Sequence, residues 1–240
     1  MSRPELSVVL PVYNEGENVV PTLEAVERAL AGVAHETFVV YDFDEDPTVP
    51  VVKRLQATLP SVRPLRNDLG RGVLNAIKAG FGAASAPHVL VTMADASDDP
   101  DDIPAMLELA RQGADVVAGS RYMPGGRQYG GPLIKRTLSR IAGLSLHWIG
   151  GMPIHDPTNN FKIYSRRLLD SVEIESTAGF ELATELTAKA YLKGMKLAEV
   201  PTTWRDRVAG ESNFQLRRWL PHYLHWYLIG MGGRLRRRTR

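Results

Sequence analysis

The stretch Val89–Pro100, VLVTMADASDDP, decides the fold. Its first four residues, Val89–Thr92, are apolar or β-branched and predict a buried parallel strand, because such strands are near-continuous apolar runs. In open α/β sheets, ligands bind just outside the carboxyl ends of the strands. Acidic residues occupy that position here and therefore stand where a ligand would bind: Asp95, Asp98, Asp99, Asp101 and Asp102.

These acids have two interpretations. Carboxylates this close repel one another unless a cation neutralises them, and Mg²⁺ takes oxygen ligands, often one or two carboxylates plus substrate phosphates. The first interpretation is therefore a metal–diphosphate site. The second is a solvated acidic loop that caps the next helix, with Asp98 or Asp99 at its N-terminus and Pro100 in the first turn. The two are compatible, because a cap needs only one aspartate.

Composition narrows the class of protein. A chain of 240 residues with 44% hydrophobic content suits one α/β domain with a sizeable core, or one domain with an appendage. The absence of cysteine excludes disulfides, a thiolate nucleophile and a cysteine-based zinc site, and fits a reducing compartment. We expect no signal peptide, because no charged-then-apolar leader opens the chain. No apolar run approaches the roughly 20 residues of a membrane span, so we expect a cytoplasmic protein, peripheral at most on the cytoplasmic membrane face.

The positive charge is concentrated at the C-terminus. The net charge is +2, yet five of the last seven residues, 234–240, are arginine, so we expect no basic nucleic-acid-binding face. The preceding segment, Trp219–Met231 (WLPHYLHWYLIGM), carries aromatic and leucine residues at helical spacing. An aromatic amphipathic helix beside arginines suits a membrane surface. An ordinary helix packed on the domain is the alternative.

Strands and helices alternate along the first half of the chain. This order predicts βαβ units and a mostly parallel sheet flanked by helices. Right-handed crossovers would bring the strand ends near Tyr13, Asp42 and Asp95 to one edge, which favours a metal–nucleotide site there. Met123–Gly131, with four glycines and a proline, is expected to be a loop long enough to act as a lid. We divide the chain into a catalytic domain, 1–213, and an amphipathic helix with an arginine-rich tail, 214–240.

Several segments resemble family 2 glycosyltransferases of the GT-A fold. SVVLPVYNEGEN resembles the family's opening, and RNDLGRGVLNAIKAGF its following segment. DVVAGSRYMPGG is similar to the strand and loop of the polyprenyl- and dolichyl-phosphate sugar synthases. The distal FELATELTAKAYLKGMKLAEVPTTWRDRVAGESN, with its Glu-Val-Pro and Arg-x-x-Gly-Glu-Ser pieces, is similar to the same subgroup. The resemblance runs from about Leu6 to Asn213, in the family's order.

The resemblance implies a reaction and a set of roles. The donor would be a nucleotide sugar, GDP-mannose or a UDP-sugar, and the acceptor a polyprenyl phosphate. Transfer would be an inverting single displacement that uses Mg²⁺ or Mn²⁺. The residues that match the family's motifs receive these roles: Pro11, Tyr13 and Glu15 contact the nucleobase and ribose, Asp42 the base edge; Gly72 lets backbone approach the donor; Arg121 meets the acceptor phosphate or the departing diphosphate; Arg207 and Ser212 hold phosphate oxygens.

The chain departs from the family pattern at two places. The usual Asp-x-Asp after the central strand aligns with Ala94 and Ala96. We expect Asp95 and Asp98 to hold the metal instead, because three residues of loop can curl to bring both together. The usual Asp-Asp-x-Ser after the second strand reads Asp42-Phe43-Asp44-Glu45 here, which keeps one matching acid and leaves the base preference open.

The acceptor decides what catalysis requires. A phosphate monoester is already anionic near neutral pH and needs only cationic positioning, by Arg121 and Arg207. A sugar hydroxyl would need a base, for which Asp98 or Asp99 is the candidate. We favour the phosphate. Three alternatives remain. In the first, Arg121 is a structural ion-pair partner of the acidic loop. In the other two, the chain is a nucleotidyltransferase, or a sugar-nucleotide-binding domain with little or no activity. Absent G-x-G-x-x-G and P-loop patterns argue against hydride transfer and ATP hydrolysis.

Overall fold

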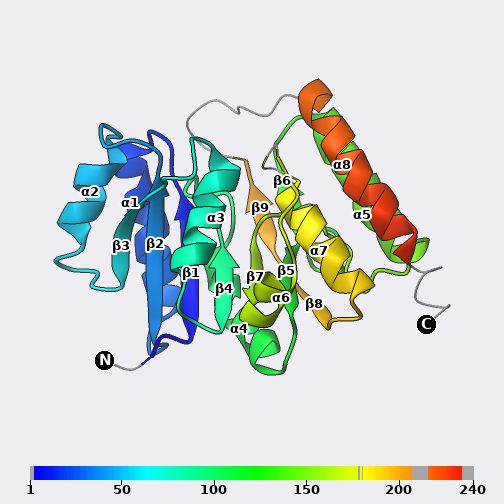
Figure 1. Ribbon diagram of the computed structural model, residues 1–240, viewed down its shortest axis with the longest axis horizontal. Coiled ribbons are helices and arrows are strands. Elements are labelled where there is room, and N and C mark those ends of the chain that lie inside the picture. The colour runs from blue at the N-terminus through cyan, green and yellow to red at the C-terminus, as the bar shows by residue number, and fades with distance from the viewer. Residues whose placement is uncertain (1–2, 178, 180, 207–215, 234–240) are drawn as a thin grey trace.

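A seven-stranded sheet forms the centre of the computed structural model, which describes residues 3–177, 179, 181–206 and 216–233. The strand order is β3-β2-β1-β4-β7-β5-β8 (Figure 1). β7 is antiparallel to both of its neighbours, and the other pairings are parallel. The mostly parallel α/β sheet predicted from the sequence is therefore confirmed. The strands are β1 (Leu6–Pro11), β2 (His35–Tyr41), β3 (Val62–Arg66), β4 (His88–Val91), β5 (Val116–Ser120), β7 (Lys162–Ser165) and β8 (Leu197–Pro201).

Helices cover both faces of the sheet (Figure 1). Successive side chains of a strand point to opposite faces, so Val9 of β1 packs with Leu74 and Ile77, while Val8 packs with Met106 on the other side. Burial of both faces explains why the strands are apolar runs and do not alternate. One face carries α3 (Val73–Ala83), α6 (Arg166–Ser171) and α7 (Leu182–Leu192); the other carries α1 (Val19–Ala29), α2 (Thr48–Leu55) and α4 (Ile103–Arg111).

Helix α3 crosses β1 at Gly80. A Cβ added at this glycine would lie 2.3 Å from Val9 Cγ1 and 2.8 Å from Val9 Cγ2. We therefore expect Gly80→Ala to lower the free energy of unfolding by about 2 kcal/mol, the usual cost of overpacking a core. Gly82→Ala on the same helix is the matched control, because nothing lies within 4 Å of its added Cβ. It should raise stability by up to about 1 kcal/mol through helix propensity. Urea unfolding measures both, and equal effects would contradict the close crossing.

A second, two-stranded sheet corrects the predicted lid. Met123–Gly131 is not an unstructured loop, because β6 (Arg127–Tyr129) lies within it and pairs in parallel with β9 (Thr203–Arg205). The backbone N–H of Arg205 in turn donates to the Ser97 carbonyl at 2.9 Å, which ties β9 to the acidic loop. Such short strands are held by partners some 75 residues away in sequence, so local composition gave no sign of them.

Two long helices, α5 (Leu133–Trp148) and α8 (Leu216–Met231), lie side by side (Figure 1). The Ser145 hydroxyl of α5 lies 3.0 Å from the Tyr227 hydroxyl of α8. The aromatic helix predicted at the C-terminus is present, but its apolar residues divide: Trp226 is buried, whereas three leucines are about half exposed, Leu220, Leu224 and Leu228. The predicted domain boundary at 213/214 falls outside the described residues. Within the described ranges, each helix is too short or too polar to cross a bilayer.

Candidate active site

The carboxyl ends of four strands meet at one edge of the sheet. β1 is parallel to β2 and to β4, and β4 and β5 are both antiparallel to β7, so all four run the same way. The residues that follow these strands, Tyr13, Asp42, Asp95 and Arg121, therefore share that edge. The prediction that the strand ends near Tyr13, Asp42 and Asp95 lie at one edge is confirmed, but Tyr13 and Asp42 do not line the cavity that Asp95 lines.

The acidic loop separates its capping aspartate from its paired aspartates. The Asp99 carboxylate accepts from the backbone N–H of Asp101 at 3.2 Å and caps the short helix that Pro100 begins. Ala96 adopts a φ of +55°, in the left-handed region that few residues other than glycine visit. This turn lies between Asp95 and Asp98 and lets both line one cavity. The capping interpretation of the sequence is confirmed for Asp99, and Asp95 and Asp98 are the pair that lines the cavity.

Asp98 is the buried member of the acidic pair. It is 7% exposed, and its carboxylate accepts from the Thr92 hydroxyl at 3.3 Å and the Met93 N–H at 3.4 Å. Burial, and then the nearby negative charge of Asp95, raise the pKa of Asp98 to about 7. Asp95 accepts from the Ser97 N–H at 3.1 Å. A cation beside these oxygens would relieve the repulsion between the two carboxylates.

Cationic side chains line the cavity that the acidic pair faces. Its volume is about 410 Å³, and Asp95, Asp98 and Arg121 all contribute to its wall. The start of α5 adds two residues that sequence reasoning did not identify, Lys135 and Arg136. Negative and positive groups thus share one cavity of the size of a small-ligand site.

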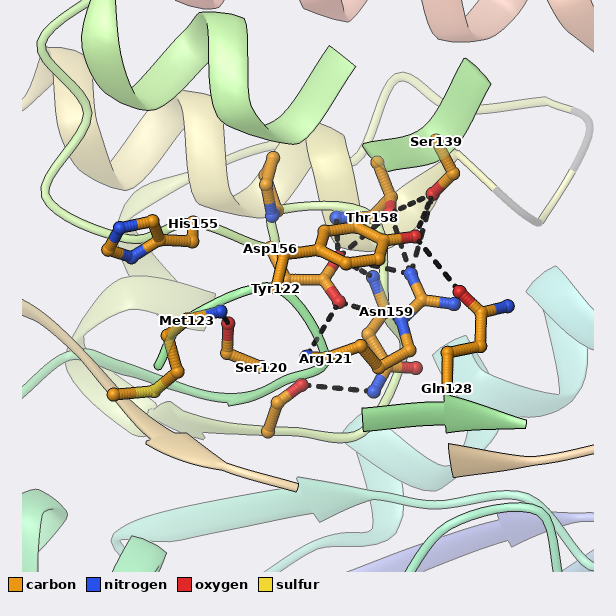
Figure 2. A network of polar contacts seen from close by, with 12 residues as sticks. Ser120, Arg121, Tyr122, Met123, Gln128, Ser139, His155, Asp156, Thr158 and Asn159 are labelled. Atoms are coloured by element: carbon orange, nitrogen blue, oxygen red, sulfur yellow. Dashed lines mark hydrogen bonds and ion pairs between the residues drawn. The ribbon is translucent and has the colours of Figure 1, made fainter. Parts of the chain in front are cut away.

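Arg121 is held in a buried ion pair (Figure 2). Its Nε donates to Asp156 Oδ2 at 2.7 Å and its Nη2 to Asp156 Oδ1 at 3.1 Å. The Arg121 side chain is 10% exposed and that of Asp156 is 0% exposed. Among the described residues, Nη1 makes no hydrogen bond to protein, so this end of the guanidinium can bind a ligand oxygen. The alternative in which Arg121 forms an ion pair with the acidic loop is wrong, because Arg121 pairs with Asp156.

Asp156 lies in the segment 155–160, HDPTNN, which the sequence identified only as a turn. Its Oδ1 accepts from the backbone N–H of Thr158 and of Asn159, each at 3.2 Å, so the carboxylate also builds the turn. An aspartate whose carboxylate accepts from the backbone N–H two residues later commonly forms such a turn. That signal does not name the arginine that the carboxylate pairs with.

Two further residues fix the segment that carries Asp156. Glu199, from the Glu-Val-Pro piece, accepts from the His155 N–H at 2.8 Å and lies 2.5 Å from His155 Nδ1. On the other side, the buried Lys162 ammonium donates to the Asp156 carbonyl at 3.2 Å. Burial lowers the pKa of Lys162 to about 7. The loop that positions Arg121 is thus held from both neighbouring strands.

The ion pair makes stability depend on pH. Burial alone would raise the pKa of Asp156, but the Arg121 charge and hydrogen bonds outweigh it and hold the pKa at about 2, below its ordinary 3.8. The unfolded chain therefore takes up this proton first as pH falls. The ion pair contributes about 2 kcal/mol to the free energy of unfolding above roughly pH 4, and this contribution is lost as the pH approaches about 2. We expect the stability gap between the wild type and Asp156→Asn to narrow from about pH 6 to about pH 2.5 in urea unfolding; a constant gap would contradict this.

The residues predicted to bind the nucleoside lie along the β1–β2 part of the edge. Tyr13 is 56% exposed, and its ring meets the Phe43 ring edge-on, with centroids 5.8 Å apart. Asp42 accepts from Asn67 Nδ2 at 2.7 Å and from the Gly72 N–H at 2.8 Å. Gly72 has a φ of +123°, which favours glycine. Asp42 thus holds the loop that brings Gly72 to the edge.

The other residues predicted to bind the donor or phosphate make few contacts that bear on ligand binding. Pro11 is buried at the end of β1, and the backbone N–H of Glu15 donates to the Thr48 hydroxyl at 3.0 Å. The five predicted nucleoside-binding residues do not line the cavity of the acidic pair: Pro11, Tyr13, Glu15, Asp42 and Gly72. Arg207 and Ser212 lie outside the described residues.

The donor set of the acidic pair fits a hard divalent cation. Among the described residues, no group of three or more histidine, cysteine or acidic side chains could hold a metal ion. Two carboxylates with mutual repulsion remain, and Mg²⁺ or Mn²⁺ is commonly bound by one or two carboxylates together with substrate phosphates. Asp95 and Asp98 therefore suit a metal that arrives with a diphosphate.

Comparison with known proteins identifies the family. Residues 7–172 match the family model described as "Glycosyl transferase family 2". The chain belongs to glycosyl transferase family 2. This family 2 chain is 30% identical over 229 residues to a dolichol-phosphate mannosyltransferase of Pyrococcus furiosus, covering 94% of this chain and 63% of the relative. It is 32% identical over 211 residues to a polyprenol monophosphomannose synthase of Mycolicibacterium smegmatis, covering 85% of this chain and 79% of the relative.

Solved structures share the fold of this family 2 chain. A crystal structure of glucosyl-3-phosphoglycerate synthase from Mycobacterium tuberculosis, in complex with Mn²⁺, uridine diphosphate and glucosyl-3-phosphoglycerate, superposes with a TM-score of 0.68. The sequence identity is 18%, and the match covers 95% of this chain and 80% of that one. The same synthase was also solved with Mg²⁺ and uridine diphosphate. The GT-A-like fold predicted from the motifs is thereby confirmed.

Proposed function

We propose that this family 2 chain transfers a sugar from a nucleotide sugar to a polyprenyl phosphate, with inversion and with Mg²⁺ or Mn²⁺. The observation that carries the proposal is the single cavity shared by the Asp95–Asp98 pair, the fixed guanidinium of Arg121 and the basic start of α5. The relatives' names, dolichol-phosphate mannosyltransferase and polyprenol monophosphomannose synthase, support a lipid-phosphate acceptor. They also favour mannose as the transferred sugar.

The residues of the cavity divide the work of the displacement. Asp95 and Asp98 would hold the cation, which supplies positive charge to the departing nucleoside diphosphate. Arg121 and the cations of α5 orient the acceptor phosphate, which is anionic near neutral pH and needs no strong base. One phosphate oxygen attacks the anomeric carbon on the face opposite the leaving group, and the bond from that carbon to the diphosphate oxygen breaks. The configuration at that carbon is therefore inverted.

Charge balance explains why Arg121 is not the only cation required. Asp156 neutralises most of its charge, so the paired guanidinium contributes direction and hydrogen bonds more than net attraction. Lys135 and Arg136 line the same cavity and would add positive charge beside a bound phosphate. Arg207, outside the described residues, is proposed to add to it.

An exposed apolar surface beside the cavity suits the lipid part of the acceptor. On α5, Ile134, Leu138, Ile141 and Trp148 are between 42% and 71% exposed, at helical spacing along one stripe. The half-exposed leucines of α8 lie on the neighbouring helix. Leu138 of α5 and Leu220 of α8 also line the cavity, so this surface reaches the site. Exposed apolar residues interspersed with Lys135 and Arg140 match an anionic bilayer surface.

A transfer assay tests the proposal. The full chain is incubated with radiolabelled GDP-mannose or a UDP-sugar, Mn²⁺, and a polyprenyl phosphate in vesicles, and the labelled lipid is extracted. We expect labelled polyprenyl phosphate sugar that disappears with a chelator. Label on a free sugar acceptor would favour transfer to a hydroxyl. Nucleotide binding with no product from any acceptor would favour a binding domain, and either result would overturn the proposal.

A further inference from the structure

A serine in the middle of α5 reaches the Arg121 ion pair. Ser139 follows the exposed Leu138 directly and lies two residues before the exposed Ile141. Its hydroxyl lies 2.7 Å from the Thr158 hydroxyl, 2.9 Å from the Tyr122 hydroxyl and 3.4 Å from Arg121 Nη2 (Figure 2). One side of α5 is therefore open to solvent, while the other contacts the residues that hold Arg121.

The direction of each hydrogen bond in this cluster follows from proton counting. Ionised Asp156 can only accept, so the Thr158 hydroxyl donates its one proton to Asp156 Oδ1 at 2.9 Å. Thr158 must then accept from Ser139, and Ser139, having donated its proton, must accept from Tyr122. The result is a directed chain from Tyr122 through Ser139 and Thr158 to Asp156.

Ser139 has no proton left to donate to a ligand in this arrangement. Its proton goes to Thr158 and its oxygen accepts from the Tyr122 hydroxyl. Arg121 Nη2 lies 3.4 Å from Ser139 and donates at shorter range to Thr158 and Asp156. A phosphate oxygen could therefore bind Ser139 only by breaking the chain. Its role is to hold other residues in place.

We propose that Ser139 and Tyr122 are positioning residues that couple the docking of α5 on an anionic lipid surface to the position of Arg121. The inference rests on the proposed function for the lipid surface and for the role of Arg121. Hydrogen bonds weaken steeply beyond about 3.5 Å, so a displacement of α5 by about an ångström would break the links from Ser139 to Thr158 and to Arg121 Nη2. The guanidinium would then be held by Asp156 and Thr158 alone. The Tyr122 ring supports the same group, with the guanidinium carbon 4.8 Å from its centroid. Fixing α5 on a surface would fix this cluster.

Hydrogen exchange tests the coupling without any donor or acceptor. The full chain is mixed with vesicles of phosphatidylglycerol and phosphatidylcholine, and peptides covering 119–123 and 155–161 are followed by mass spectrometry. We expect exchange in both peptides to slow at least about threefold on vesicles, as expected when a local opening is suppressed. In Ser139→Ala, vesicle binding should persist and the slowing should be lost. Ser139→Thr, which keeps the hydroxyl, should restore it.

Ser145→Ala is the matched control on the same helix. Its hydroxyl bonds to the Ala142 carbonyl at 3.1 Å and lies near Tyr227, away from Arg121, so the vesicle response should match the wild type. Slowing that survives in Ser139→Ala, or a wild type that does not bind vesicles or respond to them, would overturn the inference. Failure of the proposed function would instead appear as absent sugar transfer with the exchange response intact. With transfer present, Ser139→Ala should lower kcat on vesicles about tenfold, and Ser139→Thr should recover it.

Discussion

Arg121→Lys is expected to lower kcat for sugar transfer by about 10²-fold, the scale of losing one preorganised donor to a developing or bound anion. Lysine keeps the charge that Asp156 needs, but it cannot reproduce the two-point contact of the guanidinium or direct a further N–H at the phosphate. Binding of the nucleoside diphosphate should change little. Steady-state kinetics with a polyprenyl phosphate in vesicles measures the loss.

The lysine variant is chosen because removing the charge altogether would leave Asp156 buried and unpaired, which destabilises a protein by about 3–5 kcal/mol. A thermal melt should show that Arg121→Lys is folded. Arg111→Lys is the matched control, because Arg111 pairs with Glu5 at 2.6 Å near the start of β1, at the opposite edge of the sheet. Unaltered turnover in Arg121→Lys, or an equal loss in Arg111→Lys, would rule out the role assigned to Arg121.

Asp98→Asn should lower transfer by about 10²-fold or more, because an amide binds a divalent cation far more weakly than a carboxylate does. The same change removes a buried charge that Asp95 repels, so the melting temperature without ligand should not fall. The distinguishing readout is the stabilisation by a nucleoside diphosphate with Mn²⁺, which a ligand confers by binding only the folded state. That shift should shrink in Asp98→Asn and in Asp95→Asn.

Asp101→Asn provides the comparison for these variants. Asp101 is exposed and belongs to the same loop, yet its backbone only donates to the capping Asp99. It should keep both turnover and the Mn²⁺-dependent shift. If Asp95→Asn and Asp98→Asn behave like Asp101→Asn, the acidic pair does not hold the metal.

The parts of the fold that follow local rules could be predicted from the sequence. The apolar runs predicted the strands, and the order of strands and helices predicted that Tyr13, Asp42 and Asp95 would lie at one edge of the sheet. The Asp-x-Asp frame was misleading in isolation, because the loop holds its two acids three residues apart, around the left-handed Ala96. A departure from a motif thus left two carboxylates at the same cavity.

The partners of Arg121 could not be predicted, because they depend on contacts between distant segments. Asp156 lies 35 residues further along the chain, Thr158 lies 37, and the link from Ser139 crosses from a helix. Each of these residues has an ordinary local explanation, as a turn former or a polar helix position. Only the tertiary arrangement shows that they converge on one guanidinium.

The reversed strand β7 has a consequence for how the protein folds. β4 and β5 have no hydrogen bonds to each other, and β7 joins them from between. A nascent chain that has not yet extended past Ser165 therefore lacks the strand that unites the two halves of the sheet, and Arg121 lacks Asp156. Closure of such non-local pairings is slow compared with local helix formation. The cavity should consequently mature late, in one cooperative step with β7 insertion, and any chain truncated before that strand should expose both sheet edges and aggregate.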